Sequence, residues 1–324
     1  MTRWKLLAIL IGSTGLLALL AYAGFAAVGD SAKRIGLPGL AFISLIHLPV
    51  IALTGYAWFR VGDGFTPASP WQYVWARYVR EATAEVLPFS QLGGIVAGAR
   101  ALVLTGLGAP SVARSLVADL VIEQIAKLPY VLAGGVLLLT GRHAAPLGLV
   151  AYALLPALTL LIAGLIFRNR AAPLLARVAR ALVRRVPSLR IHTADAVWPK
   201  ANRRLGVNRR TTTTYIIHTA AWVMGTAETW VVFHLLGLAV TASEAFIIDS
   251  LFCGLRTFGF AIPAALGAQE AAYVLVCALF GIPAAPALAL SLVRRVREWI
   301  VGLPALAIWQ LIEGRRALAG LSRE

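Results

Sequence analysis

Two glutamates occupy the same place in a repeated pattern, V-x-E-x-I-x-x-L-P, within apolar stretches. The first copy covers residues 121–129 around Glu123, the second covers 296–304 around Glu298, and the offset is 175 residues. An ionised side chain at bilayer depth costs about 2.5–3.5 kcal/mol on insertion scales, so it needs a partner or a function. Two interpretations are open: interfacial ion pairs that hold helices together, or a polar path for a lipid headgroup.

Basic residues accompany both glutamates at helical spacing. Lys127 lies four residues after Glu123, and Arg294 lies four residues before Glu298, with Arg295 and Arg297 adjacent to it. Residues four apart share one face of a helix, so each glutamate has a candidate partner on its own helix.

The same offset of 175 residues relates longer segments of the chain. It superposes Pro88 on Pro263 and Gly106 on Gly281, with ten identities between 88–129 and the shifted segment. Matching prolines and a glutamate is far less expected than matching alanines, although coincidence in an Ala/Leu-rich chain remains the alternative. An internal repeat with helix-breaking prolines in both copies is typical of transporters.

In two regions of this repeat, 70–106 and 243–281, the sequence predicts a helix, a Pro/Gly break and a second helix. Pro removes a backbone donor, so such breaks survive at membrane depth only where protein or water shields them. We expect two re-entrant hairpins; two short crossing helices apiece are the alternative. The candidate substrate-path residues in the hairpins are Arg80, Glu81, Glu85, Asp249, Arg256 and Glu270, and the helix-break residues are Pro88, Gly93, Gly94, Pro263 and Gly267.

The composition indicates a polytopic membrane protein. Of 324 residues, 59% are hydrophobic and 14% charged, with a mean hydropathy of +0.79. Runs of about 20 apolar residues mark spanning helices, near 6–28, 37–60, 112–140, 146–167, 208–238 and 285–312. Basic residues next to these runs account for the net charge of +16, so anionic lipid is a better partner than nucleic acid.

The basic segment 168–210 sets the expected orientation. It carries twelve Lys/Arg against one acid, so it should be cytoplasmic, together with both chain termini. If the hairpins do not cross, they enter from opposite sides and the two copies are inverted. Leu174, Val178 and Leu182 recur every four residues among arginines, which predicts a basic amphipathic helix on the inner leaflet; a solvated linker is the alternative.

Signatures of metal, cofactor or enzyme chemistry are missing from the sequence. The five histidines lack metal-ligand spacing, the two cysteines lie apart, and no phosphate-binding Walker loop occurs. We therefore predict no metal, no cofactor and no enzymatic activity. Glu228, beside Thr226 and Thr229, is either a functional acid or an acid bonded to a neighbouring helix.

Segments 85–94, 262–270 and 294–298 resemble the flippase-like family, which shares its fold with the membrane part of lysylphosphatidylglycerol synthase, the multiple peptide resistance factor. Residues 91–94 and 294–298 are most similar to the branch associated with hopanoid biosynthesis. The resemblance implies a membrane domain that handles lipids. The sequence extends only shortly past Glu313, so we expect no soluble aminoacyl-transferase domain and no synthesis of lysyl-lipids.

Taken together, the sequence predicts an all-α polytopic protein with about six spanning helices and two re-entrant hairpins in an inverted repeat. Residues 1–324 form one integral membrane domain, with repeats near 70–141 and 243–316 and a basic loop at 168–207. The predicted function is lipid translocation in a bacterial inner membrane, for hopanoids or phospholipids. The alternatives are an accessory protein that holds lipid-biosynthetic enzymes at the membrane, and a lipid-modifying enzyme using Glu270 or Asp249.

Overall fold

The computed structural model describes residues 17, 21, 25–62, 68–86, 90–141, 208–256 and 267–321. Several sequence predictions lie outside these residues: most of the span at 6–28, the span at 146–167, the amphipathic part of the loop at 168–207, Pro88 and Pro263.

Every regular element within the described ranges is an α-helix, which confirms the predicted all-α class. The helices are α2 (Phe25–Gly62), α3 (Pro70–Val86), α4 (Ser90–Leu104), α5 (Ala109–Thr140), α9 (Arg209–Leu235), α10 (Ala242–Arg256), α11 (Ala268–Ala278) and α12 (Ala284–Leu321).

Two helices in the described part of the chain are long and apolar enough to cross a membrane. They are Lys33–Gly62 within α2 and Ala109–Thr140, which is α5. The predicted spans at 208–238 and 285–312 form α9 and α12, of 27 and 38 residues, and these carry more charged and polar side chains. The number of helices that cross the bilayer stays a prediction.

Short-range signals explain where several helices begin. The Asn208 side chain caps α9 by accepting hydrogen bonds from the backbone N–H groups of Arg210 and Thr211, at 3.0 and 3.1 Å. Thr241 and Glu244 form a reciprocal capping box at the start of α10. A kink at Gly36, with φ of 60°, divides α2 before its long apolar part.

The helices that the structure describes fall into two groups of four, α2–α5 and α9–α12, with the same order along the chain. α5 begins at Ala109 and α12 at Ala284, the offset of 175 residues found in the sequence. Gly106 and Gly281, which precede these helices at equivalent places, both have positive φ, at 100° and 68°. Positions 175 residues apart therefore share backbone conformation here, as well as residue type.

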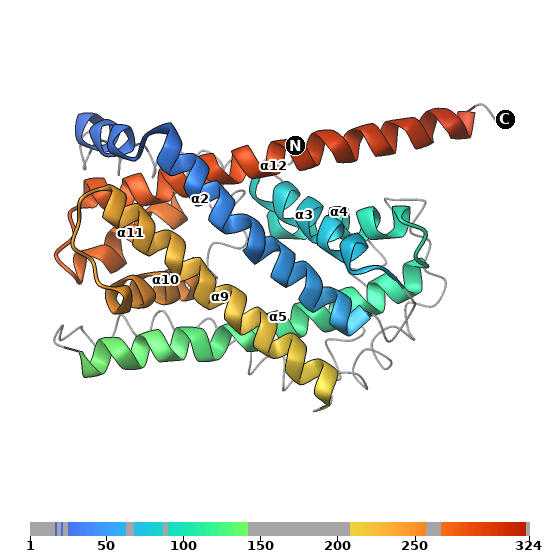
Figure 1. Cartoon of the computed structure of the whole chain (residues 1–324), viewed down its shortest axis with the longest axis horizontal. Coiled ribbons are helices and arrows are strands. Elements are labelled where there is room, and N and C mark those ends of the chain that lie inside the picture. Colours follow the sequence, from blue (N-terminus) through green and yellow to red (C-terminus); the bar gives the residue numbers. More distant parts are fainter. Residues whose placement is uncertain are drawn as a thin grey trace.

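Equivalent helices run in opposite directions. α2 and α9 pack side by side across the middle of the molecule, with their chain directions reversed (Figure 1). α12 crosses one edge of the view and α5 the other, again in opposite directions (Figure 1). This is the arrangement that an inverted repeat requires, while the orientation in the membrane stays a prediction.

Each group has its own apolar core. Trp58, Tyr73 and Leu102 are buried in the core that α2–α5 share. Phe233 and Tyr273 are buried in the larger core built mainly by α9–α12. Some buried charged side chains bond within one group, as Glu123 does, and others bond across the two groups, as Asp119 does with His218.

Candidate functional site

A buried ion cluster joins α3 to α5. The Arg77 guanidinium donates two hydrogen bonds to Glu123, at 3.1 and 2.8 Å, and Arg80 donates a third at 3.0 Å. Arg80 also reaches Asp119 at 3.4 Å. These side chains are at most 8% exposed, so the charges neutralise one another in an environment that water does not reach.

Two further groups complete this first cluster. Glu81 accepts from Arg77 at 2.7 Å and is 29% exposed, which makes it the outer edge of the cluster. His218 comes from α9, in the other helix group, and its Nε2 lies 2.9 Å from Asp119 Oδ1 with both side chains fully buried. The first cluster therefore ties the second helix group to the first.

A second buried cluster surrounds Asp249 of α10. Arg294 of α12 donates to Asp249 Oδ1 at 2.7 Å, and the Thr229 hydroxyl donates to the same oxygen at 2.9 Å. The Tyr130 hydroxyl of α5 donates to the other carboxylate oxygen at 2.7 Å. Tyr130 also lies 2.8 Å from the hydroxyl of Thr226, so four helices meet at this carboxylate.

Glu228 extends the second cluster toward α2. Arg297 contacts Glu228 Oε2 at 3.0 Å, and His47 of α2 places its Nδ1 2.7 Å from Glu228 Oε1. Arg297 also contacts His47 directly. Glu228 is thus bonded to neighbouring helices, one of the two roles considered for it, and His47 mirrors His218 by reaching from one helix group into the other.

An ion pair with partly exposed side chains connects the two groups where α3 and α10 end. Arg256 near the end of α10 pairs with Glu85 near the end of α3, and Gln91 of α4 donates to Glu85 at 3.0 Å. The Arg256 and Glu85 side chains are 30% and 16% exposed. Glu298 lies within electrostatic reach of this pair and contacts Arg297 at 3.4 Å. We name Glu85, Arg256 and Glu298 the hairpin-end cluster.

Glu270 is held within its own helix group. It accepts from Arg295 at 2.6 Å and from Ser291 at 3.0 Å, both on α12. Its other oxygen accepts the backbone N–H of Gly267 at 2.9 Å. A carboxylate with this many partners positions the start of α11 against α12.

The predicted pairs on a single helix are not formed. Lys127 donates to Gln124 at 3.3 Å and lies over the ring of Trp222, instead of pairing with Glu123. Arg294 binds Asp249 instead of Glu298. The physical reason is that arginines or carboxylates on other helices make shorter, more buried contacts than a partner on the same helix.

Gly93 and Gly94 were predicted to break a helix, but both lie inside α4 (Ser90–Leu104), where Gly94 instead allows close packing against α3. A Cβ at Gly94 would sit 2.5 Å from the backbone oxygen of Arg80, so only glycine allows this approach. Gly93 is half-buried. Gly267 has φ of 75° at the start of α11, a conformation that glycine adopts without strain. The contact at Gly94 positions the backbone that carries Arg80.

Sequence reasoning missed several residues of these clusters. Asp119 lies four residues before Glu123 in the same predicted span, so the rule that selected Glu123 also applies to it. His47, His218 and Tyr130 gave no such signal, because their significance comes from neighbours 96–250 residues away. No three His, Cys, Asp or Glu side chains in the described ranges are grouped as metal ligands.

Residues 5–305 match the model of the family described as the lysylphosphatidylglycerol synthase TM region. The chain belongs to this family. It is therefore a helical membrane protein with a lipid-related role, as the resemblance in the hairpin segments predicted. Comparisons with curated proteins and with solved structures gave no match.

Family membership changes how the buried clusters are understood. In a soluble protein they would be interior ion pairs, but here they lie among helices embedded in lipid. A charged side chain without a partner would be costly there. This explains why the Arg77 guanidinium donates two hydrogen bonds to Glu123 in the first cluster. The hairpin-end cluster differs, because two of its members, Arg256 and Glu85, are 30% and 16% exposed, whereas Glu298 is 9% exposed.

Proposed function

We propose that this protein is a lipid translocase of a bacterial inner membrane. The lipid headgroup would pass the hairpin-end cluster between the two helix groups, while the apolar chains stay in the bilayer. The translocated amphiphile would be a phospholipid or a hopanoid. The protein would act without a cofactor and without chemical change to the lipid, and both termini would face the cytoplasm.

The observation that supports the proposal is the partly exposed ion pair between Arg256 and Glu85. The two residues come from different helix groups, and each stands beside the end of a helix that precedes a predicted break. Charged side chains that remain 30% and 16% exposed in a lipid-embedded protein need a polar partner on their open side. A headgroup that carries one positive and one negative charge can bond to both Arg256 and Glu85.

The buried clusters supply the supporting frame. The Asp249 and Glu123 carboxylates each accept hydrogen bonds from side chains of other helices on both oxygens. Neither can therefore bind a headgroup while these hydrogen bonds are formed. The bonds to Asp249 join α5 of the first group to α10 and α12 of the second, and the bonds to Glu123 join α3 to α5 within the first group. Two similar halves meeting at one polar site can expose that site to either side in turn.

The test is leaflet exchange by purified protein in liposomes, with headgroup-labelled phospholipid and a hopanoid analogue in separate preparations. Wild-type protein is expected to accelerate exchange of at least one lipid. Arg256→Gln and Glu85→Gln are each expected to lower the rate at least tenfold. Asp30→Asn is the matched control, because Asp30 and Lys33 form an ion pair at the surface, 66% and 82% exposed.

Two results would count against the proposal. Folded wild-type protein that exchanges neither lipid would favour the accessory role in lipid biosynthesis. A change in the mass of the recovered lipid would favour a lipid-modifying enzyme. Equal exchange by Arg256→Gln and Asp30→Asn would leave translocation in place but remove the hairpin-end cluster from its path.

A further inference from the structure

His47 reaches from α2 into the other helix group and has a different partner for each of its charge states. Its Nδ1 atom lies 2.7 Å from Oε1 of Glu228 on α9, and the same nitrogen contacts the Arg297 guanidinium of α12. A protonated imidazole donates from Nδ1 to the carboxylate, whereas a neutral imidazole with its proton on Nε2 accepts from the guanidinium. The Nδ1 atom of His47 therefore has a partner whether or not it carries a proton.

Charged side chains from the helices packed against α2 face His47. α9 provides Glu228, α12 provides Arg297, and α3 provides Glu81, which lies within electrostatic reach of the imidazole. α5 also packs against α2, and its Glu123 acts on the same Glu81. The His47 side chain is 15% exposed and that of Glu228 is 2% exposed. A proton from outside can therefore reach the imidazole, although its carboxylate partner is enclosed.

The ion cluster to which His47 belongs has one carboxylate more than it has arginines. Within the described ranges, four carboxylates and three arginines are connected by ion pairs or lie within electrostatic reach of one another: Glu85, Asp249, Glu228 and Glu298, and Arg256, Arg294 and Arg297. The cluster thus carries one net negative charge while His47 is neutral, and none when His47 is protonated. Because an uncompensated charge is costly away from water, a proton on His47 stabilises the cluster.

Two neighbouring cations do not alter this balance. Arg295 is paired with Glu270 at 2.6 Å, so this pair is neutral by itself. The Lys127 ammonium donates to Gln124 and contacts no carboxylate in the part of the chain that the structure describes. Neither cation therefore compensates the additional carboxylate.

The first cluster has the same balance of charges. There, three carboxylates face two arginines and one histidine: Glu81, Asp119 and Glu123, with Arg77, Arg80 and His218. The side chains of His218 and its partner Asp119 are both 0% exposed, whereas His47 is partly open. Of the two histidines, His47 is therefore the one that can exchange its proton with the surroundings.

Arg297 links His47 to the hairpin-end cluster. Its guanidinium lies 3.0 Å from Glu228 and 3.4 Å from Glu298, so the two carboxylates share one positive charge. A protonated His47 neutralises Glu228 and leaves the charge of Arg297 to Glu298. With a neutral His47, Arg297 is divided between the two carboxylates and the hairpin-end cluster is more negative. The proton on His47 therefore changes the charge that a headgroup meets at Glu298.

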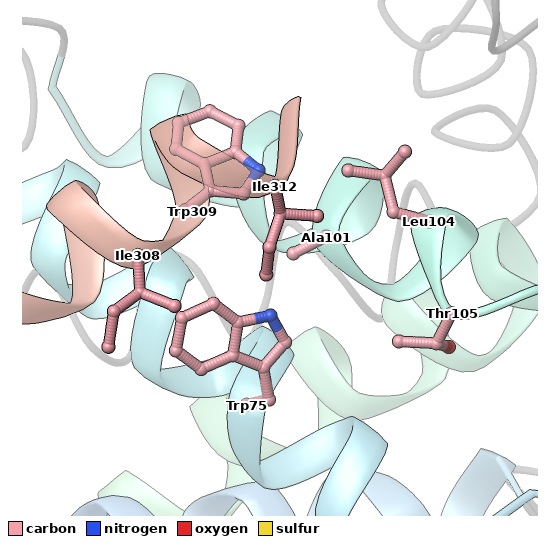
Figure 2. A pocket seen from close by; sticks show the side chains of 7 residues that line it. All are labelled: Trp75, Ala101, Leu104, Thr105, Ile308, Trp309 and Ile312. Carbon is pink, nitrogen blue, oxygen red and sulfur yellow. The ribbon is translucent and has the colours of Figure 1, made fainter. Parts of the chain in front are cut away.

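The pocket between α3, α4 and α12 is unsuited to a charged group. It measures about 290 Å³ and is lined by seven residues, among them Trp75 and Trp309, and none of the seven is charged (Figure 2). A charged headgroup therefore finds its partners in the ion clusters and not in this pocket.

We propose that His47 is a proton-binding site coupled to the hairpin-end cluster, so that a lipid headgroup with net negative charge enters this cluster together with a proton. The inference rests on the proposed function and adds to it the class of lipid and the accompanying ion. A negative headgroup is repelled by a cluster with one carboxylate in excess and not by a neutral cluster. Proton and headgroup therefore strengthen each other's binding, by the same factor for each.

The first experiment observes the proton directly, by NMR of the full-length protein with isotope-labelled histidine in detergent micelles. The His47 signals are those that are missing from His47→Gln. They are expected to change from the neutral to the charged form between about pH 8 and about pH 5.5, the range in which histidine titrates. Phosphatidylserine, with one net negative charge, is expected to make the proton bind about threefold more tightly. Phosphatidylcholine, with no net charge, is expected to have a smaller effect.

The second experiment measures leaflet exchange of chain-labelled phosphatidylserine in liposomes, with the same pH on both sides. Wild-type protein is expected to exchange this lipid about threefold faster at about pH 6 than at about pH 8. His47→Gln keeps a hydrogen-bonding group opposite Glu228 but cannot take up the proton, so its exchange should be slow at both pH values. His234→Gln is the matched control, because His234 is an exposed histidine of α9 whose Nδ1 faces the backbone oxygen of Trp230.

Three outcomes would overturn the inference. They are a His47 ring that keeps one charge state across this range, a titration that phosphatidylserine does not shift, and a pH dependence of exchange that persists in His47→Gln. The last result would place the proton on another group, such as Glu298. Failure of the proposed function gives a different result. If phosphatidylserine shifts the His47 titration but wild-type protein exchanges no lipid at any pH, the proton-linked headgroup site stands and translocation does not.

Discussion

The equivalent glutamates Glu123 and Glu298 should respond differently to the same substitution. Glu123 is 7% exposed and accepts three hydrogen bonds from Arg77 and Arg80. Breaking a buried ion pair by removing one partner costs about 3–5 kcal/mol. We expect Glu123→Gln to lower the free energy of unfolding by about 3 kcal/mol, the lower end of this range. The cost is at the lower end because Asp119 still forms ion pairs with both arginines.

Glu298 has much weaker contacts. Its only direct ion pair in the described part of the chain is with Arg297 at 3.4 Å, and Arg297 has a second carboxylate partner in Glu228 at 3.0 Å. Glu298→Gln should therefore cost about 1 kcal/mol or less, the scale of one ordinary hydrogen bond. If headgroups pass the hairpin-end cluster, this variant should still lower leaflet exchange.

The chain provides its own probe of unfolding. Its two cysteines, Cys253 and Cys277, are both buried, so a thiol-reactive dye reports exposure of the core on heating. Glu123→Gln should become reactive at a clearly lower temperature than wild type in the same detergent, and Glu298→Gln close to wild type. Equal melting temperatures for the two variants would refute the assignment of Glu123 as structural and Glu298 as part of the path.

Three further predictions use the same dye assay. Tyr130→Phe removes the donor to Asp249 and should cost about 1.5–3 kcal/mol, the range for hydrogen bonds to charged groups. Gly134→Ala would place a Cβ 1.7 Å from Ser250 Oγ and should lower the melting temperature strongly, whereas adding Ser250→Gly should restore most of the loss. Gly281→Ala forces alanine to φ of 68° and should cost about 1 kcal/mol.

Matched variants separate these effects from general damage. Tyr273 is fully buried, and its hydroxyl has no partner among the described residues, so Tyr273→Phe should not destabilise the protein. Gly314 is helical with open space around it, so Gly314→Ala should be neutral or stabilising. Losses as large in these variants as in Tyr130→Phe and Gly281→Ala would contradict the contacts described here.

Much of the helical architecture was predictable from the sequence. The runs at 37–60 and 112–140 correspond to long parts of α2 and α5, because a continuous apolar run has few other stable forms. The equivalence of Gly106 and Gly281 was also visible, since positive φ requires the same residue type at both places. The family followed from the hairpin segments and is confirmed, whereas the hopanoid branch stays a prediction.

The pairing of charges was not predictable in the same way. Same-helix spacing gave Lys127 as the partner of Glu123, but α3 supplies Arg77 and Arg80 at shorter range. Spacing along one helix says nothing about the helix that packs against it. Pro88, Pro263 and the basic loop at 168–207, which carried other predictions, lie outside the described residues.

By itself, the sequence determined that this protein is helical and lipid-embedded, and it predicted an internal repeat, because hydropathy, helix length and rare residue types are local properties of the chain. Only the tertiary structure decided which charges are enclosed and which remain open. Glu123 and Glu298 stand in the same motif and are similarly buried, at 7% and 9% exposed, yet one is bonded to two arginines of α3 and the other adjoins the partly exposed Arg256–Glu85 pair. Enclosure depends on which antiparallel helices meet there, and that is a property of packing between residues distant in the chain.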